Sequence, residues 1–281
     1  MKPRDLVAIL NAPKPERLGL IAEGLELLAE HVSTLRDDLL HLQDAGRSRG
    51  AAVIDGLASE EAAKMLILLD VVRMGWSEPD AVRRQLRNFY SHLARGIYAR
   101  LTAGRPADLA EVRSYAESLR RSLYLDGPND VDWIFRNSVE ADREDSLYVD
   151  YVTSEGESVW ITPARLSDGT LSFGPSMVVD LALALHRLGC LSAKGLEIVS
   201  KEWAGFPLGD DTHWVQVEAI NKSVLNEVHA AGLCSENATR ADVRLALQQW
   251  IFPLGGLDLS SIKVTKTELL AQREQWVASQ W

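Results

Sequence analysis

The sequence has only two cysteines, Cys190 and Cys234, and no apolar run long enough to cross a bilayer. Two cysteines without a Cys-x-x-Cys spacing predict neither a disulfide framework nor a zinc cluster. A membrane-spanning helix would need about 20 consecutive apolar residues. The first residues are too short and too charged a segment for a secretory signal peptide. We therefore expect a folded, cytoplasmic protein that does not enter the membrane.

Several kinds of catalytic site also lack their sequence signals. The glycines fall in no phosphate-loop spacing, and serine, cysteine and histidine form no nucleophile elbow. His186, His213 and His229 lie among carboxylates, but their spacings match no metal-ligand pattern. Asp210, Asp211 and Thr212 are better explained as a helix cap before His213. We expect no metal and no cofactor.

Charge is distributed unevenly along the chain. The net charge of −10 argues against a protein that simply coats nucleic acid. Residues 1–125 carry 18 Lys and Arg against 17 Asp and Glu, whereas residues 126–281 carry 12 against 23. Within the first part, residues 73–105 hold seven arginines and two acidic residues. This excess predicts either a solvated basic helix face or a surface for a phosphate backbone.

Apolar residues in the first 125 positions recur at helical spacing. Gly46 and Gly75 are helix stops, and Ser77 is a cap for a helix that begins near Pro79. Short connections favour antiparallel neighbours and thus an up-down four-helix bundle. The expected helices run from about Ile21 to Leu42, over 48–75, from about Pro79 to Leu101, and from Leu109 to Leu123.

The pattern changes after residue 125. A linker with a short helix around Trp133–Phe135 leads to two β-prone runs, 147–152 and 158–161, which predict a hairpin. Helical patterns then return at 176–188, 192–204, 213–231, 239–251 and 266–279. We therefore expect a mostly α protein. Its parts would be a four-helix bundle (1–125), a linker helix with hairpin (126–174), and a C-terminal helical region (175–281) that senses or regulates.

The third expected helix carries the stretch Arg87-Asn88-Phe89-Tyr90-Ser91-His92. On a straight helix, at about 100° per residue, Arg87 and His92 lie off the apolar stripe and about 140° apart. Asn88 lies one turn from His92 on the same side. A site within one chain would need the arginine to reach across or the helix to bend. The other possibility, which we expect, is that two copies of the chain build the site jointly.

The second expected helix places a carboxylate in its apolar stripe. Glu61 falls near the middle of that stripe, whereas Glu60 can point to solvent and Lys64 sits at the edge. A core-facing carboxylate is costly unless it is paired. Two partners remain open: Arg87 from the adjacent helix, which Glu61 would then orient, or a local ion pair such as Glu61–Lys64 that only fixes helix register.

The stretch GAAVIDGLASEEAAKMLIL, which contains Glu60, Glu61 and Lys64, resembles the second helix of the AbiV family of abortive-infection proteins. The downstream SLYVDYVTSEGESVWITP resembles the segment that follows the helical bundle in that family. The Arg-Asn-x-x-x-His pattern is similar to the motif of HEPN-domain ribonucleases. The resemblance covers about residues 15–165.

The resemblance implies a cytoplasmic antiphage endoribonuclease that needs no metal, pairs as a homodimer and stays latent until a phage-encoded activator is sensed. His92 would move the proton of a ribose 2′-hydroxyl, Arg87 would hold the scissile phosphate, and Asn88 would orient them. Glu61 and Lys64 would support Arg87, and Arg83, Arg84 and Arg95 would bind RNA.

One position departs from the pattern of many HEPN proteins, which carry a tyrosine two residues after the histidine. This chain has Ala94 there, so control by modification of that tyrosine is in doubt. Two other functions remain open. The chain could be a non-catalytic helical module that binds a partner or RNA, or the inhibitor subunit of a two-component system.

Overall fold

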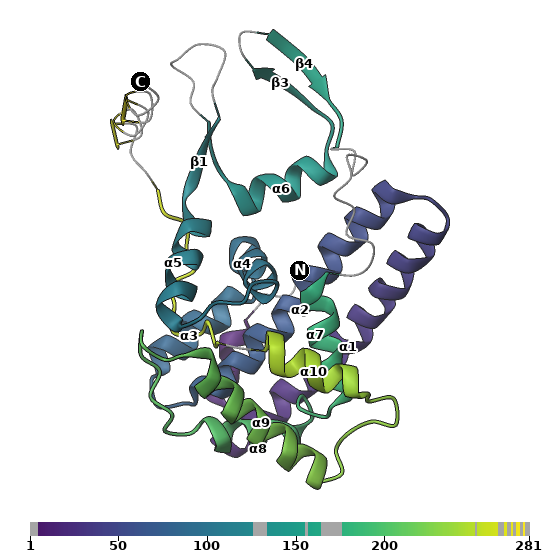
Figure 1. Cartoon of the computed structure of the whole chain (residues 1–281), viewed down its shortest axis with the longest axis vertical. Helices are drawn as coiled ribbons and strands as arrows, with labels where there is room; N and C mark the ends of the chain where they lie inside the picture. The colour runs from purple at the N-terminus through teal and green to yellow at the C-terminus, as the bar shows by residue number, and fades with distance from the viewer. Residues whose placement is uncertain are drawn as a thin grey trace.

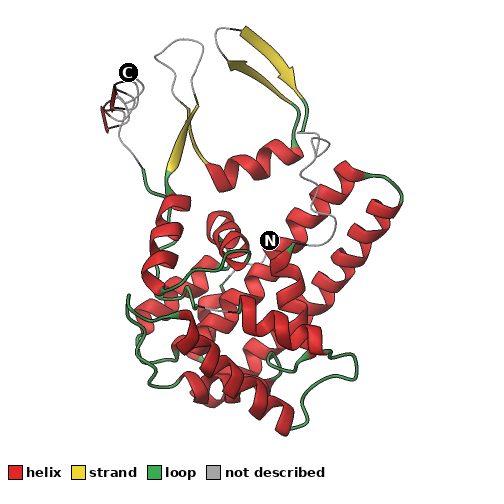
Figure 2. Ribbon diagram, viewed as in Figure 1, coloured by secondary structure: helices red, strands yellow, loops and turns green. Residues whose placement is uncertain are grey.

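The structure is a computed structural model that describes residues 5–125, 134–154, 157–163, 176–250 and 252–263, with scattered positions between 267 and 278. The described part is mostly helical, as expected, with two small antiparallel β-ladders (Figures 1 and 2). The short helix expected at Trp133 and the boundary expected at 174/175 fall at least partly outside the described residues, as does most of 266–279.

Two long helices, α1 (Lys14–Asp44) and α2 (Ser48–Met74), form an antiparallel pair. The expected stripe of α1 is buried at Ile21, Leu25 and Val32. Gly46 and Gly75 follow the two helices with φ angles of 68° and 70°, the left-handed conformation that favours glycine at a helix end. A short 3₁₀ helix, η1 (Leu6–Asn11), precedes α1.

The third expected helix is in fact two helices, α3 (Pro79–Asn88) and α4 (His92–Thr102). Ser91 ends the continuity: its extended backbone caps α4, and its side chain accepts a hydrogen bond from the backbone N–H of Ala94 at 3.2 Å. Phe89 and Tyr90 fill the turn, and the Tyr90 hydroxyl accepts a hydrogen bond from the backbone of Leu6. The straight-helix geometry expected for Arg87 and His92 is therefore wrong.

The segment after α4 differs from expectation in its details. Helix α5 (Leu109–Arg120) is shorter than predicted and gives way to β1 (Ser122–Leu125). In place of the expected short helix, residues 134–137 form β2 (Ile134–Asn137), which pairs with β1. Helix α6 (Ser138–Leu147) then leads to the expected hairpin of β3 (Asp150–Ser154) and β4 (Glu157–Ile161).

Asn137 and Gly96 position α6 over the bundle. The buried Asn137 side chain accepts hydrogen bonds from the first backbone N–H groups of α6 and donates to the carbonyls of Leu119 and Arg121. A Cβ at Gly96 of α4 would lie 2.1 Å from the Val139 side chain of α6. Glycine is therefore required where the two helices meet.

The C-terminal helices lie where the sequence predicts them and pack against the first helices. They are α7 (Met177–Arg187), α8 (Ala193–Trp203), α9 (Trp214–Ala230) and α10 (Arg240–Gln249). Helices α7 and α8 contact both α1 and α2, and the buried apolar residues form one continuous core from Ile21 to Leu259. None of the described helices combines the length and apolarity that a bilayer crossing requires.

Candidate active site

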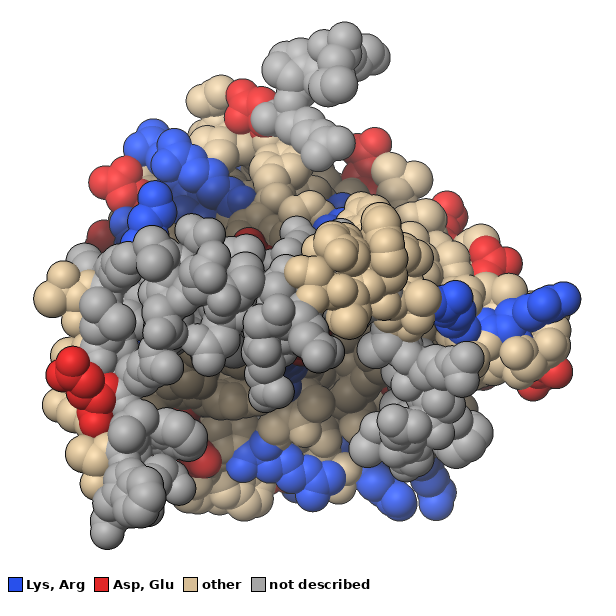
Figure 3. Space-filling view, turned by 90° about the horizontal axis from the view of Figure 1, so that it is seen from above, with Lys and Arg blue, Asp and Glu red and all other residues tan. Residues whose placement is uncertain are grey.

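His92 is the first residue of α4, directly after the Ser91 cap. Its side chain is 49% exposed, and it lines a pocket of about 710 Å³ between the α1–α2 pair, α4 and α6. The end of the molecule that carries α6 and the β-ladders is hollowed, with basic side chains at several points around its rim (Figure 3). A pocket of this volume is within the range of small-molecule and nucleotide sites.

Glu60 of α2 is the carboxylate that meets His92. The Nδ1 atom of His92 lies 2.9 and 3.1 Å from the two Glu60 oxygens. Arg95 of α4 approaches Glu60 at 3.1 Å, and Nε of Arg143 from α6 lies 2.9 Å from it. Glu60 is 15% exposed, so the expectation that it points to solvent is wrong. The cause is α6, which covers this side of α2.

Arg95 lies inside this cluster. Sequence reasoning placed it with Arg83 and Arg84 as an RNA-binding residue, but its side chain is only 8% exposed. Its Nη2 atom lies 2.8 Å from Nδ1 of His92, and its Nε donates to the Ser91 carbonyl at 3.3 Å. Arg83 and Arg84 are exposed on α3, where Arg83 pairs with Asp80.

Arg87 and Asn88 end α3 on the other side of the turn. Arg87 is exposed, and within the described residues its side chain forms no hydrogen bond or ion pair with His92 or Glu61. Asn88 donates to the side-chain oxygen of Gln85 at 3.1 Å. Arg87 and His92 therefore flank one turn but are not in contact within the chain.

The sequence left two partners open for Glu61, Arg87 and a local ion pair, and the structure shows the local ion pair. The Glu61 carboxylate pairs with Lys64 at 2.5 Å, and both side chains are largely buried. Lys64 also lies over the ring of Phe89, with its Nζ 5.1 Å from the ring centroid. This pair therefore supports the turn between α3 and α4 through Phe89, and not through a contact with Arg87.

A buried polar chain extends inward from Asn88. Gln85, which is fully buried, donates to the Tyr98 hydroxyl at 2.6 Å, and Tyr98 donates to Asp70 at 2.6 Å. Each donor points toward Asp70, whose ionised carboxylate only accepts. The Gln85 amide also donates to the carbonyl of Ile67 at 3.0 Å, so these two acceptors together fix its orientation and, through it, that of Asn88.

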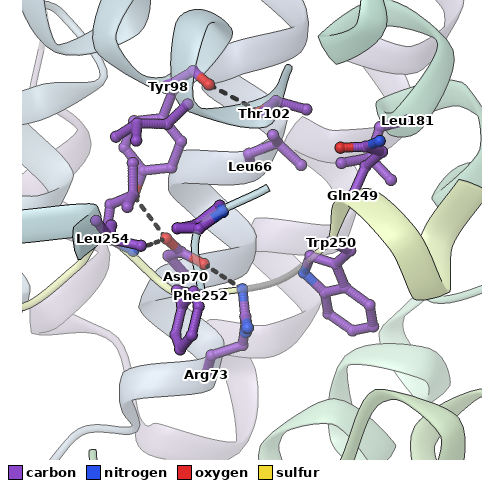
Figure 4. Close-up of a pocket in the computed structure, with 13 residues that line it drawn as sticks. Leu66, Asp70, Arg73, Tyr98, Thr102, Leu181, Gln249, Trp250, Phe252 and Leu254 are labelled. Carbon is purple, nitrogen blue, oxygen red and sulfur yellow. Dashed lines mark hydrogen bonds and ion pairs between the residues drawn. The ribbon is translucent and has the colours of Figure 1, made fainter. Parts of the chain in front are cut away.

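The inner end of this chain is closed by the C-terminal region (Figure 4). Asp70 pairs with Arg73 at 3.0 Å and accepts the backbone N–H of Leu254 at 2.7 Å. The Arg73 guanidinium lies 4.0 Å from the ring centroid of Trp203 and 5.1 Å from that of Trp250. Burial raises the pKa of Asp70, and Arg73 opposes that rise. Burial and the neighbouring Asp70 raise the pKa of Tyr98 well above its usual value.

His186 and His213, which the sequence placed among carboxylates, lie outside this cluster. His186 contacts Glu26 at 2.9 Å, and His213 is itself the cap residue of α9, with Gln216 completing the capping box. The sequence predicted the cap at residues 210–212, whereas the cap is the next residue, His213. In the described part of the chain, no group of three or more histidine, cysteine or acidic residues gathers as a metal site would.

The comparison with protein families agrees with the sequence resemblance. The family model HEPN_AbiV, described as AbiV, matches residues 20–178, which is more than half of the chain and includes Glu60, Arg87 and His92. No curated protein and no solved structure matched the chain. The chain belongs to the AbiV family of HEPN proteins.

Proposed function

We propose that this abortive-infection HEPN protein is an endoribonuclease whose reaction occurs at His92 and Arg87. One observation carries the proposal: a half-exposed histidine, held by a carboxylate through one ring nitrogen, opens onto a pocket, and an exposed arginine lies at the other end of the turn that precedes it. A positioned histidine with a free second nitrogen suits proton transfer near neutral pH.

The proposed reaction is attack of a ribose 2′-hydroxyl on the adjacent phosphate. The bond from O2′ to phosphorus forms and the bond from phosphorus to O5′ breaks. His92 takes the 2′-hydroxyl proton, a second acid gives a proton to O5′, and the products are a 2′,3′-cyclic phosphate and a 5′-hydroxyl. Arg87 offsets charge on the phosphate oxygens, and Asn88 holds the end of α3 that carries Arg87. None of these steps uses a metal ion.

We further propose that the active form is a homodimer. Helical phase gives no support to a homodimer, because α3 and α4 are separate helices. The chemistry supplies another reason. A base at O2′ and an acid at O5′ are both needed, and the described residues of one chain place one histidine at this pocket. A second copy would bring a second His92, and its Arg87, to the same phosphate.

Cleavage by purified protein in EDTA tests the proposal, with and without lysate of phage-infected cells as a source of activator. His92→Ala is expected to lower the rate by about 10²- to 10⁴-fold, and mass spectrometry of the products should show cyclic phosphate ends. His31→Ala, an exposed histidine on α1, is the matched control and should retain the wild-type rate. Equal cleavage by wild type and His92→Ala would reject this site.

The same experiment separates the alternative functions. A non-catalytic RNA-binding module predicts that RNA is bound and released uncut by wild type and by His92→Ala alike. Arg87→Lys adds a finer test, because lysine keeps the charge but loses the planar fork of the guanidinium. A catalytic phosphate clamp predicts a large loss of rate in Arg87→Lys, whereas simple charge attraction predicts almost none.

A further inference from the structure

Two partners compete for one nitrogen of His92. Both the Glu60 carboxylate and the Arg95 guanidinium lie within hydrogen-bond distance of Nδ1. A carboxylate only accepts, so it requires a proton on Nδ1, whereas a guanidinium only donates, so it requires a lone pair there. In either neutral tautomer, Nδ1 can form a hydrogen bond with only one of these two partners. The two partners therefore favour opposite tautomers of the neutral ring.

The surrounding contacts decide the competition. With the proton on Nδ1, His92 donates to Glu60, Arg95 donates to Glu60 and to the Ser91 carbonyl, and Arg143 donates to Glu60. Each of these contacts then joins a donor to an acceptor, and the unfavourable contact that remains is the one at 2.8 Å between the Arg95 guanidinium and the protonated Nδ1. With a lone pair on Nδ1, the carboxylate oxygens would face that lone pair at 2.9 and 3.1 Å, which is repulsive. Arg95 has other acceptors, whereas the His92–Glu60 contact needs the proton.

We infer that Glu60 is a positioning residue that holds His92 with its proton on Nδ1, so that Nε2 is the atom that exchanges a proton with RNA. The role of Nε2 in the reaction rests on the proposed function. The tautomer does not, because it is a property of the resting protein. Nε2 is on the opposite edge of the ring from Glu60. When neutral it can act as a base, and when protonated as an acid, while Nδ1 keeps its proton in both forms.

This arrangement suits a site made from two copies. The same Glu60 contact serves a neutral His92 in one subunit and a charged His92 in the other, because both forms carry the Nδ1 proton. Arg95 and Arg143 also donate to the carboxylate, so Glu60 keeps charged partners in both forms of His92. Glu60 therefore supports either role without rearrangement.

The tautomer can be measured without RNA. Nitrogen-15 NMR at a pH where His92 is neutral distinguishes the two ring nitrogens, and the signals are assigned by their loss in His92→Gln. The wild type should show mainly the Nδ1–H form. In Glu60→Ala, Arg95 remains beside Nδ1 as a donor, so the major form should change to Nε2–H. A wild-type ring that is mainly Nε2–H, or an unchanged ring in Glu60→Ala, would overturn the inference.

A matched control and a conservative variant complete the test. Glu26→Ala removes another carboxylate that contacts a histidine, His186, and should leave the His92 signals unchanged. In Glu60→Gln the amide oxygen can still accept from Nδ1, so this variant should keep the Nδ1–H form even if Glu60→Ala is poorly folded. Circular dichroism and thermal unfolding report on folding in each variant.

Cleavage kinetics then connect the tautomer to the reaction. Glu60→Ala should lower kcat by about 10- to 100-fold, as loss of an orienting partner does, with little change in KM because the role assigned to Glu60 is to orient His92 and not to bind RNA. Combined with His92→Ala, it should cause no further loss, since the two residues act as one unit. A mainly Nδ1–H ring in a protein that cuts no RNA would reject the proposed function and retain the tautomer assignment. Independent, additive losses of rate would reject Glu60 as a positioning residue.

Discussion

Helix α2 carries two acidic clusters, centred on Glu60 and Asp70, which differ in how far their side chains are exposed to solvent. At Asp70 and Arg73 the side chains are 4% and 2% exposed, and the carboxylate is held by Arg73, Tyr98 and the Leu254 backbone. At Glu60 the carboxylate is mostly buried, but His92 is 49% exposed and Arg143 is 37% exposed. The first cluster lines a small cavity of about 40 Å³ beneath the C-terminal region, whereas the second opens onto a pocket of about 710 Å³.

The comparison shows how similar residues acquire different roles. Around Asp70 each donor points toward the carboxylate, so the cluster has one arrangement and fixes its neighbours. Around Glu60 two partners lie against the same histidine nitrogen, and the second nitrogen has no hydrogen-bond partner among the described residues. A closed, fully partnered cluster suits stability, and an open, contested cluster suits proton transfer.

The largest expected effect is on stability at the closed cluster. Asp70→Ala leaves Arg73 buried without its carboxylate and should lower the free energy of unfolding by about 3–5 kcal/mol. Glu60→Ala should lower it by about 1–2 kcal/mol, because several of its partners can reach water. Urea unfolding at pH 7 measures both, with the exposed Asp80→Ala as control. Equal losses at Asp70 and Glu60 would remove the distinction between the clusters.

A smaller effect is expected at the aromatic cover of Arg73. Trp203→Phe weakens the cation–π contact at 4.0 Å and should lower the free energy of unfolding by about 1–2 kcal/mol. No hydrogen bond of the indole N–H is lost, since it has no partner among the described residues. Trp214→Phe, at an exposed ring, is the control and should change stability by less than about 0.5 kcal/mol. If both variants lose the same amount, the Trp203 ring does not stabilise Arg73.

The smallest effect concerns Cys190, which lies in the core beside the C-terminal helices. Burial raises the pKa of its thiol to about 12. Because the folded-state pKa is raised, its stabilising contribution is complete below about pH 9 and is lost as the pH rises toward 12. At pH 8, Ellman's reagent should therefore react with Cys234 in the folded protein and with both thiols in urea. Rapid reaction at Cys190 would show that this region opens readily.

Much of the fold follows from local signals in the sequence. The apolar stripe of α1, the glycines that follow α1 and α2, and the two β-prone runs of the hairpin all predicted their elements. The C-terminal helices were predicted within a few residues. The break at Ser91 was missed because Leu86, Leu93 and Ile97 are all buried, so that the apolar spacing continues across the turn. The signal that could have revealed the break is Ser91, because serine is a residue that often caps the start of a helix.

The sequence singled out His92 as a candidate but not Glu60, the carboxylate that contacts it in the structure. Helical phase correctly placed Glu61 near the core of α2, yet it gave Glu60 to solvent. Glu60 is covered by α4 and α6, and α6 reaches it from more than 70 positions along the chain. The phase of one helix describes which residues share a face. It does not describe which later segment packs on that face.

The turn between α3 and α4 has a consequence for how such sequences diverge. Because Ser91 restarts the helix, an inserted or deleted residue among the turn positions 89–90 would leave His92 at the first position of α4. The same change within α3 would rotate Arg87 by about 100°. We therefore expect the position of the serine directly before the histidine to be more sensitive to such a change than the length of the turn that precedes it.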